Sequence, residues 1–435
     1  MMPVVVTAGH AGHGKSSLVR ALAGLGAAPG VAFADLPAAL PAWLAAAGPA
    51  SAVLFAVAAD RGWREQSQEH LDALAALGVR HGVLAITFAD AADPRHALRQ
   101  ARDRLAGTVL RGAEAVPVST ATGAGLAALA AALDRLAGRL PVPDPDAPVR
   151  LWADGAHHAA GTAAITGTLS AGTLHVGDEL LLMPAERRVV LTAIETAGES
   201  RTSVRAPARV TAEFPASRPP GGGALVTPGR WTPTSCVDVR TRFGAAAGRL
   251  ARRATLHVGA AAVPVRLRPL GPDTARLTLN ARLPLHAGDT GVLRAPEQGT
   301  VAGVSVLDLR PPPLVRPGAG AARARELASW PDRPDGRTVL RRHGLLRRAD
   351  LPPMGCAPPP DAIDLPDGWL ADPAHWAALR GRLAAEVARH AAAHPAAPGL
   401  PMETLRLRLG LPSRRLVPVL AEPPLRIERG RVHAS

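Results

Sequence analysis

The chain has 435 residues, of which 47% are hydrophobic, and a formal net charge of +14. This length accommodates roughly three domains of about 100–200 residues each, and the alternating apolar patterns exclude a mainly disordered chain. No run reaches the roughly 18 apolar residues of a membrane span and no signal pattern starts the chain, so we expect no membrane contact and no secretion. Two cysteines, Cys236 and Cys356, exclude a disulfide framework and fit a reducing cytoplasm. The positive charge indicates a polyanionic partner or, with equal weight, a coding bias toward arginine.

The strongest motif lies near the N-terminus, where the apolar stretch Val4–Ala8 runs into Gly9-x-x-x-x-Gly14-Lys15-Ser16. In this pattern backbone N–H groups and the positive end of a helix surround phosphate oxygens, while the lysine reaches the outer phosphates and the serine reaches Mg²⁺. Lys15 is the only lysine among 50 basic residues, which indicates that a compact ammonium is needed at this position. The motif predicts a nucleoside triphosphate site that includes Gly9, His10, Gly12, His13, Gly14, Lys15, Ser16 and Ser17.

Strands and helices alternate over residues 1–140. This alternation predicts a parallel sheet covered by helices on both faces, with the ligand at the carboxyl ends of the strands. After the first strand, further strands are predicted at 31–35, 51–60, 81–90 and 114–119, and helices at 17–24, 66–77, 95–110 and 125–136.

The composition changes after a proline-rich linker at 141–148. Short Val, Leu and Thr segments cut by glycine turns then predict two β-barrel domains, at residues 146–232 and 235–310. The stretch Ile165–Leu182 contains the clearest hairpin, with the turn Ser-Ala-Gly and then alternating apolar residues.

The C-terminal part is rich in helix and arginine. A second linker, Pro311–Pro317, precedes a partial helical or winged-helix unit at 320–356. Residues 369–435 predict a complete winged helix, a common nucleic-acid-binding unit, with helices at 373–393, 402–409 and 413–420 and a hairpin at 425–433. Candidate phosphate contacts are Arg414, Arg415, Arg429 and Arg431, although packing on protein alone is an equally weighted alternative for this module.

Several motifs resemble the translational GTPases, and within them the selenocysteine-specific elongation factor (SelB) family. Residues Gly9–Ser16 match the family pattern G-H-V-D-H-G-K-[ST], and Ala58–Leu71 resembles A-A-D-E-G-[IV]-x-x-Q-[ST]-x-E-H-L. Thr87–Asp90 reads T-F-A-D where the subfamily has the guanine-reading T-K-A-D, and Val118–Gly123 resembles V-S-A-x-T-G. In the first barrel, the segment that begins at Ile165 is similar to V-T-G-T-L-x-S-G.

The resemblance implies a multidomain fold with three kinds of domain: an α/β P-loop GTPase domain, two β-barrel domains and a C-terminal α+β winged helix. It implies GTP and Mg²⁺ as cofactors, with Mg²⁺ held by Ser16 and, through water, by Asp35. Asp90 would accept hydrogen bonds from two guanine N–H groups, with Thr87, Ser119 and Thr120 beside it. The implied partners are selenocysteinyl-tRNA, the ribosome and a selenoprotein mRNA hairpin. Arg209 in the first barrel is the candidate contact for the tRNA. The terminal module that binds the mRNA hairpin in relatives is missing here. We expect a cytoplasmic monomer.

The chain also departs from the family pattern. Residues 25–30 lack the switch threonine, and the D-x-P-G-H motif reads D-L-P-A-A at 35–39, with Ala39 in place of the water-positioning histidine. Phe88 replaces a lysine, and Gly155 falls near a position where relatives often carry arginine. We therefore assign no catalytic residue and expect nucleotide binding with hydrolysis weakened by about two to four powers of ten.

Three functions remain open at this stage. The first is a SelB-like carrier that binds GTP and delivers selenocysteinyl-tRNA to the ribosome. The second is a catalytically degenerate, truncated paralogue that binds guanine nucleotide or RNA without efficient hydrolysis. The third, a P-loop kinase or ATPase, is disfavoured by Asp90 and by the two barrels.

Overall fold

The computed structural model describes residues 4–26, 31–34, 40, 43–44, 50–159, 161–216, 223–243, 252–295, 301–397 and 399–434. The chain divides into two compact units, residues 1–332 and 333–435, and each is described by itself. Within the described ranges, no helix is both long enough and apolar enough to cross a membrane.

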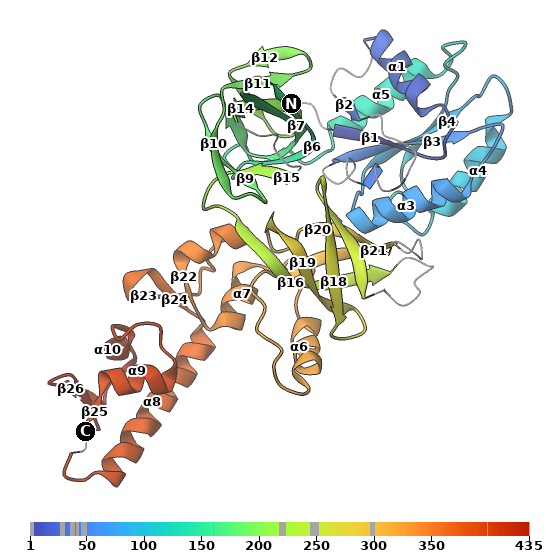
Figure 1. Ribbon diagram of the computed structural model, residues 1–435. Coiled ribbons are helices and arrows are strands. Elements are labelled where there is room, and N and C mark those ends of the chain that lie inside the picture. Colours follow the sequence, from blue (N-terminus) through green and yellow to red (C-terminus); the bar gives the residue numbers. More distant parts are fainter. Residues whose placement is uncertain are drawn as a thin grey trace. The chain divides into compact units, whose positions relative to one another are not determined.

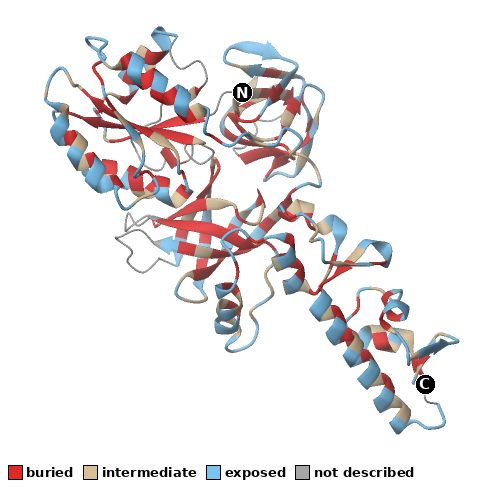
Figure 2. Cartoon of the chain, turned by 180° about the vertical axis from the view of Figure 1, so that it is seen from behind, coloured by how far each residue is buried: buried red, intermediate tan, exposed pale blue. Residues whose placement is uncertain are grey.

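The N-terminal part of the first unit, called here the phosphate-loop domain, is built on a five-stranded parallel sheet (Figure 1). Apolar residues cover both faces of the sheet, so its central strands are buried throughout (Figure 2). Helices α1 (Lys15–Gly24) and α5 (Leu126–Ala137) pack on one face, and α3 (Glu65–Leu77) and α4 (Pro94–Leu105) on the other. The strand order is β2-β1-β3-β4-β5, with bounds Ala32–Ala34, Val4–Ala8, Ala52–Ala58, Gly82–Thr87 and Glu114–Pro117.

The next part, the first β domain, is an antiparallel sheet of eight strands with an added two-stranded pair. Its long central strands are β6 (Arg150–Ala159), β7 (Thr162–Ala171) and β14 (Ala208–Pro215), and all three contribute buried residues to one apolar core. The remaining strands are β8 (Thr173–His175), β9 (Glu179–Met183), β10 (Arg187–Val190), β11 (Ala193–Thr196), β12 (Glu199–Arg201), β13 (Ser203–Arg205) and β15 (Gly223–Val226).

The second β domain closes into a six-stranded barrel in the order β16-β19-β18-β17-β20-β21. Along β18 buried and exposed residues alternate strictly, which is the pattern of a strand with one face toward a core. The bounds are β16 Thr232–Phe243, β17 Arg253–Val258, β18 Ala261–Pro269, β19 Thr274–Leu285, β20 Thr290–Arg294 and β21 Val301–Asp308.

A buried charge cluster fixes helix α6 (Ala319–Ala328) on this barrel. Asp238 on β16 is fully buried and accepts hydrogen bonds from Arg276 Nε (2.7 Å) and from Arg323 Nε of α6 (2.8 Å). Asp308 at the end of β21 pairs with the same Arg323, whose side chain is 2% exposed. Since each buried charge has a partner of opposite sign, the cluster satisfies itself only while helix and barrel stay together.

His257 in the barrel strand β17 makes stability depend on pH. Its side chain is buried, and this desolvation, with the nearby Arg294 charge, lowers its pKa from 6.5 to about 4. Below pH 6.5 the unfolded chain therefore binds a proton at His257, whereas the folded chain binds one only near pH 4. The stability that neutral His257 contributes is thus fully present above pH 6.5 and is lost as the pH falls from 6.5 to about 4. We expect wild-type stability to drop by about 3 kcal/mol from this group alone over that range.

The measurement is the melting temperature as a function of pH. His257→Leu should make the curve less steep between pH 6.5 and 4, although the buried His13, whose pKa is also about 4, keeps part of the slope. Removal of the exposed His157 should leave the shape of the curve unchanged. Equal slopes for wild type and His257→Leu would contradict the assignment.

The domains of the first unit make close contacts with one another. Helix α3 of the phosphate-loop domain packs on β20 and β21, where Thr290 Oγ1 donates to the carbonyl oxygen of Leu77 (3.0 Å). A side chain at Gly303 would come within 2.9 Å of Ala76 Cα, so glycine allows the barrel strand to approach the helix backbone. The two β domains are joined by a bidentate pair between Arg150 and Asp289 (2.6 and 3.0 Å).

The second unit contains two small α+β modules. The first consists of α7 (Gly336–His343) and a three-stranded sheet of β22 (Leu345–Arg347), β24 (Trp369–Ala371) and β23 (Ile363–Leu365). The second has three helices that share one apolar core with a hairpin, which is the arrangement of a winged helix. Its elements are α8 (Pro373–Ala393), β25 (Leu400–Pro401), α9 (Met402–Leu409), α10 (Leu416–Leu420), β26 (Arg426–Glu428) and β27 (Arg431–His433).

The predicted fold class is confirmed: a P-loop-type α/β domain is followed by two β domains and a C-terminal α+β part. Only the second β domain closes into a complete ring of hydrogen-bonded strands among the described residues, whereas the first is an open sheet.

Candidate functional site

The glycine-rich loop lies between the end of β1 and the start of α1, at the carboxyl edge of the sheet. Gly9 needs to be glycine, because its φ is +118° and a Cβ there would lie 2.1 Å from the carbonyl oxygen of Ala56. Lys15 Nζ donates to the carbonyl oxygens of Gly9 (2.9 Å) and His10 (2.8 Å), which places the ammonium beneath the loop. Ser16 and Ser17 follow in the first turn of α1, where both are exposed.

His13 serves the loop through its backbone. The side chain is fully buried with Nδ1 3.3 Å from the Ala56 carbonyl oxygen, and burial lowers its pKa to about 4. The ring is therefore neutral near pH 7 and adds no charge to the loop. His10 lies 5.1 Å from it, ring centre to ring centre.

The two segments that resemble guanine-reading motifs meet at the ends of β4 and β5. Ala89 N donates to the carbonyl oxygen of Val118 (3.1 Å), which joins the Thr87–Asp90 turn to the loop that contains Ser119 and Thr120. Ser119 is buried and its Oγ accepts from Thr122 N (3.1 Å), whereas the Asp90 and Thr120 side chains are exposed. The structure thus brings both segments to one edge, with an aspartate open for a ligand.

This edge is tied to the phosphate loop. Thr87 Oγ1 donates to the His13 carbonyl oxygen (3.0 Å), and a Cβ at Gly14 would lie 3.4 Å from the ring of Phe88. Phe88, which replaces a lysine of the family motif, therefore packs against the loop with an aromatic ring. Its φ of 55° lets the chain turn back toward Val118.

Helix α3 supports the loop from the other side, a role that the sequence did not reveal. Gln66 Oε1 accepts from Ala11 N (2.7 Å), and His70 Nδ1 accepts from Gly9 N (3.0 Å). The His70 ring also stacks on Trp43 at 4.8 Å, and Trp43 Nε1 donates to the Thr7 carbonyl oxygen (2.8 Å). The matched letters Q-x-x-E-H in this helix were the available signal.

Residue Asp35, predicted to hold Mg²⁺ through water, lies outside the described residues, as do Ala38 and Ala39. No cluster of three or more His, Cys, Asp or Glu side chains suited to a metal ion occurs in the described ranges. Ser16 remains the one predicted Mg²⁺ ligand whose position the structure gives, and no capping hydrogen bond from a side chain occupies this helix start.

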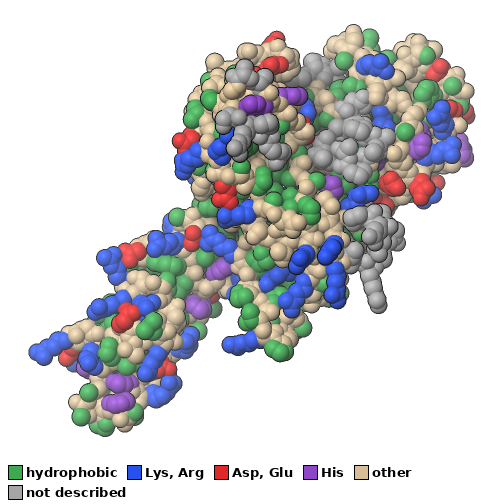
Figure 3. Space-filling view, in the orientation of Figure 1, with side chains coloured by type: hydrophobic (Ala, Val, Ile, Leu, Met, Phe, Trp, Pro, Cys, Tyr) green, Lys and Arg blue, Asp and Glu red, His purple; other side chains and the backbone are tan. Residues whose placement is uncertain are grey.

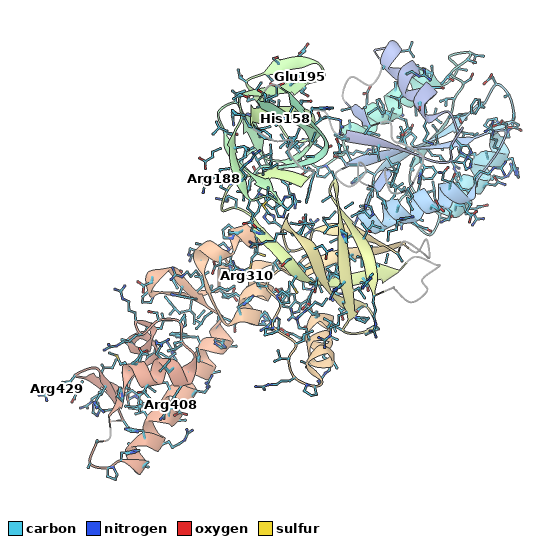
Figure 4. The ribbon with its side chains drawn as sticks, viewed as in Figure 1. His158, Arg188, Glu195, Arg310, Arg408 and Arg429 are labelled. Carbon is cyan, nitrogen blue, oxygen red and sulfur yellow. The ribbon has the colours of Figure 1, made fainter. Side chains whose placement is uncertain are left out.

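Arg209, the predicted RNA contact in the first β domain, lines a cavity of about 720 Å³. Its guanidinium forms a bidentate pair with Asp154 of β6 (2.6 and 2.8 Å), and this hydrogen-bonded pair raises the pKa of the arginine. Gly155 follows Asp154 directly, so the position without a side chain adjoins this pair. The cavity is also lined by Phe33 of β2, Glu195 of β11, labelled in Figure 4, and Arg201 and Arg205.

The four predicted arginines of the winged helix fall into two groups. Arg429 lies at the tip of the β26–β27 hairpin with φ 49° (Figure 4). Arg414 precedes α10, and its Nη2 reaches the same tip, 3.4 Å from a Cβ built on Gly430. Arg415 instead pairs with Asp367 (2.7 Å), and Arg431 donates to the Gly399 carbonyl oxygen (2.9 Å). The first pair is therefore better placed to meet a ligand than the second.

No family model matches the chain. It is 30% identical over 238 residues to a selenocysteine-specific elongation factor of Desulfomicrobium baculatum, a match that covers 47% of this chain and 37% of that protein. The chain thus matches well under half the length of this curated relative.

Solved structures extend the similarity to the whole fold. A bacterial selenocysteine-specific elongation factor, EF-Sec, superimposes on this chain with a TM-score of 0.79 at 16% sequence identity. The superposition covers all of this chain and 80% of the EF-Sec chain. The elongation factor SelB of Methanococcus maripaludis in its apo form has a TM-score of 0.63 at 19% identity, and its complex with the GTP analogue GppNHp has a TM-score of 0.62 at 18% identity. Each superposition covers 72% of this chain and 80% of the SelB chain. Over 47% of its length the chain is thus similar in sequence to a selenocysteine-specific elongation factor, and its whole fold is similar to that of the solved elongation factors of this name.

Proposed function

We propose that the chain binds GTP in the phosphate loop and carries selenocysteinyl-tRNA to the ribosome. The observation that carries the proposal is the meeting of three segments at one edge of the sheet: the loop with Lys15, the turn that ends in Asp90 and the loop that begins at Ser119. Hydrogen bonds connect the three, so one ligand with phosphates and a base can touch all of them.

The phosphates and the base of the nucleotide each have matching groups. The loop amides and Lys15 suit the phosphates, while the exposed Asp90 carboxylate suits the two guanine N–H donors. Mg²⁺ would neutralise phosphate charge, with the Ser16 hydroxyl as one ligand. The related SelB solved with GppNHp supports this choice of nucleotide.

The first β domain supplies a receptor for the aminoacyl end of tRNA in this proposal. The 720 Å³ cavity has apolar walls with charged groups at its edge, among them Arg209 and Glu195. Because Asp154 holds the Arg209 guanidinium by two bonds, the arginine presents its remaining donors in a fixed direction. A fixed cation suits an anionic selenolate.

Basic side chains on the second β domain suit the tRNA backbone (Figure 3). Arg253 and Arg266 are directly opposite each other on β17 and β18, and neither forms an ion pair with another described residue. Like charges in such a pair are unfavourable by themselves, and phosphate groups would relieve that repulsion. Arg429 and Arg414 of the winged helix would contact an mRNA hairpin in the same manner.

The test measures binding of selenocysteinyl-tRNA and seryl-tRNA to the full chain with GTP and with GDP. A GTP-dependent preference for selenocysteinyl-tRNA is expected. Equal binding in both nucleotide states would instead support a degenerate paralogue that binds RNA without a working switch, and no tRNA binding in either state would overturn the carrier proposal.

Arg209→Ala should weaken selenocysteinyl-tRNA binding about tenfold or more, because a charge-assisted contact contributes about 1.5–3 kcal/mol. Binding of seryl-tRNA should change far less. The matched control is Arg188→Ala, which removes an exposed arginine of the same domain that is paired with Glu179 and lies outside the cavity lining. Equal losses for the two aminoacyl-tRNAs would show that Arg209 does not read the amino acid.

A further inference from the structure

Arg61 stands beside the phosphate loop, at the turn that follows β3. Strand β3 is the parallel neighbour of β1, so the residues after it lie next to the loop that follows β1. A Cβ built on Gly12 would come within 2.8 Å of Arg61 Nη1. The guanidinium therefore occupies the space into which a side chain at position 12 would project.

The charge of Arg61 acts on the loop as well. Burial is the main cause of the lowered pKa of His13, and the positive charges of Lys15 and Arg61 add to it. The only ion pair that Arg61 makes with a described residue is with Asp60 at 3.4 Å, and its side chain is 49% exposed. A long, half-exposed cation whose partner Asp60 is 3.4 Å away thus lies beside a loop with a phosphate-binding pattern.

The sequence explains why Arg61 can occupy the space beside position 12. The family pattern has aspartate where this chain has Gly12 and glutamate where it has Arg61. Two acidic residues of the family pattern are thus replaced here by a glycine and an arginine, and the structure places these two residues next to each other. The mouth of the loop is more positive by three charges than the family pattern would make it.

A terminal phosphate needs such a cation here. The segment 35–39, D-L-P-A-A, lacks the glycine whose N–H meets the γ-phosphate in the family pattern, and residues 25–30 contain no switch threonine. A guanidinium offers several N–H donors in a plane and forms strong charge-assisted bonds with phosphate oxygens.

We propose that Arg61 is a γ-phosphate ligand of the nucleotide site and sets its preference for GTP over GDP. This inference rests on the proposed nucleotide binding and adds to it the residue that distinguishes the two nucleotides. Asp60 keeps the arginine near the loop when no phosphate is in reach, and the phosphate replaces Asp60 as its partner.

The experiment titrates the full chain with fluorescent mant-GppNHp and mant-GDP in the presence of Mg²⁺. Arg61→Ala should weaken GppNHp binding about ten- to a hundredfold, the range of one charge-assisted contact, and change GDP binding by less than about threefold. Arg61→Glu, which restores the family residue, should lose at least as much GppNHp affinity, and Arg61→Lys should keep part of it.

Two controls separate this inference from the proposed function. Arg99→Ala removes an exposed arginine of α4 in the same domain and should change neither affinity. If wild type binds neither nucleotide, the proposed function itself fails; if wild type binds both and Arg61→Ala weakens both equally or neither, only the role of Arg61 is overturned. Because Arg61 is exposed, unchanged thermal unfolding of Arg61→Ala without nucleotide will show that the fold is intact.

Discussion

Replacing Lys15 with alanine is expected to weaken binding of both GTP and GDP by about a hundredfold or more. Lys15 is 7% exposed and holds the Gly9 and His10 carbonyl oxygens from below, so the change removes both a cation for the phosphates and a support of the loop. Each charge-assisted hydrogen bond contributes about 1.5–3 kcal/mol, and more than one is lost.

The measurement is a titration with mant-GDP and mant-GppNHp, with Arg99→Ala as the matched control. Lys15→Arg should not restore binding, because a planar guanidinium does not fit the buried space of a compact ammonium. Affinity of Lys15→Ala within about threefold of wild type would contradict a phosphate site in this loop. Loss of both nucleotides here differs from the selective loss expected for Arg61.

Replacing Asp238 with alanine is expected to lower the free energy of unfolding of the first unit by about 3–5 kcal/mol. The carboxylate is fully buried between Arg276 and Arg323. Its loss leaves two guanidinium groups in the interior, and the remaining carboxylates, Asp308 and Glu326, pair with Arg323. Breaking a buried ion pair costs more than the pair itself contributes, because the remaining charge is desolvated without a partner.

Urea unfolding followed by tryptophan fluorescence checks this expectation, since Trp330 lies under the Arg323 guanidinium at 5.2 Å. The control is Asp332→Ala, whose carboxylate is 48% exposed and pairs with Arg240, and which should cost less than about 1 kcal/mol. Similar losses of unfolding free energy for the two variants would show that the buried Asp238 cluster contributes no more to stability than an exposed ion pair.

The sequence predicted best what depends on local patterns. The helices at 373–393 and 402–409 have the predicted bounds, since a Pro after an aspartate cap starts the first and Gly410 ends the second. The helix predicted at 95–110 ends at Leu105 instead, because Thr108 Oγ1 donates to the Leu105 carbonyl oxygen and forms a turn after it. The third winged-helix helix likewise begins at Leu416, after a turn in which Ser413 Oγ accepts from Arg415 N.

What the sequence could not predict depends on residues far apart in the chain. Gln66 and His70 reach the phosphate loop across about sixty residues, and Arg209 meets Asp154 across a sheet register that no local pattern fixes. The contact between Gly12 and Arg61 is of the same kind. The motifs thus identified the loop, while the residues that support it and border it came from the fold.

The packing of α3 on the barrel also determines where the chain can be cut. Val292 of β20 is fully buried in the same apolar core as Leu74 and Leu77 of α3, although the linker at 141–148 separates them in sequence. A fragment that stops at this linker would expose that core to water and lose the Thr290 bond to the helix end. The smallest expression fragment that keeps the nucleotide site in its native surroundings therefore ends near Asp332, after the second β domain and α6.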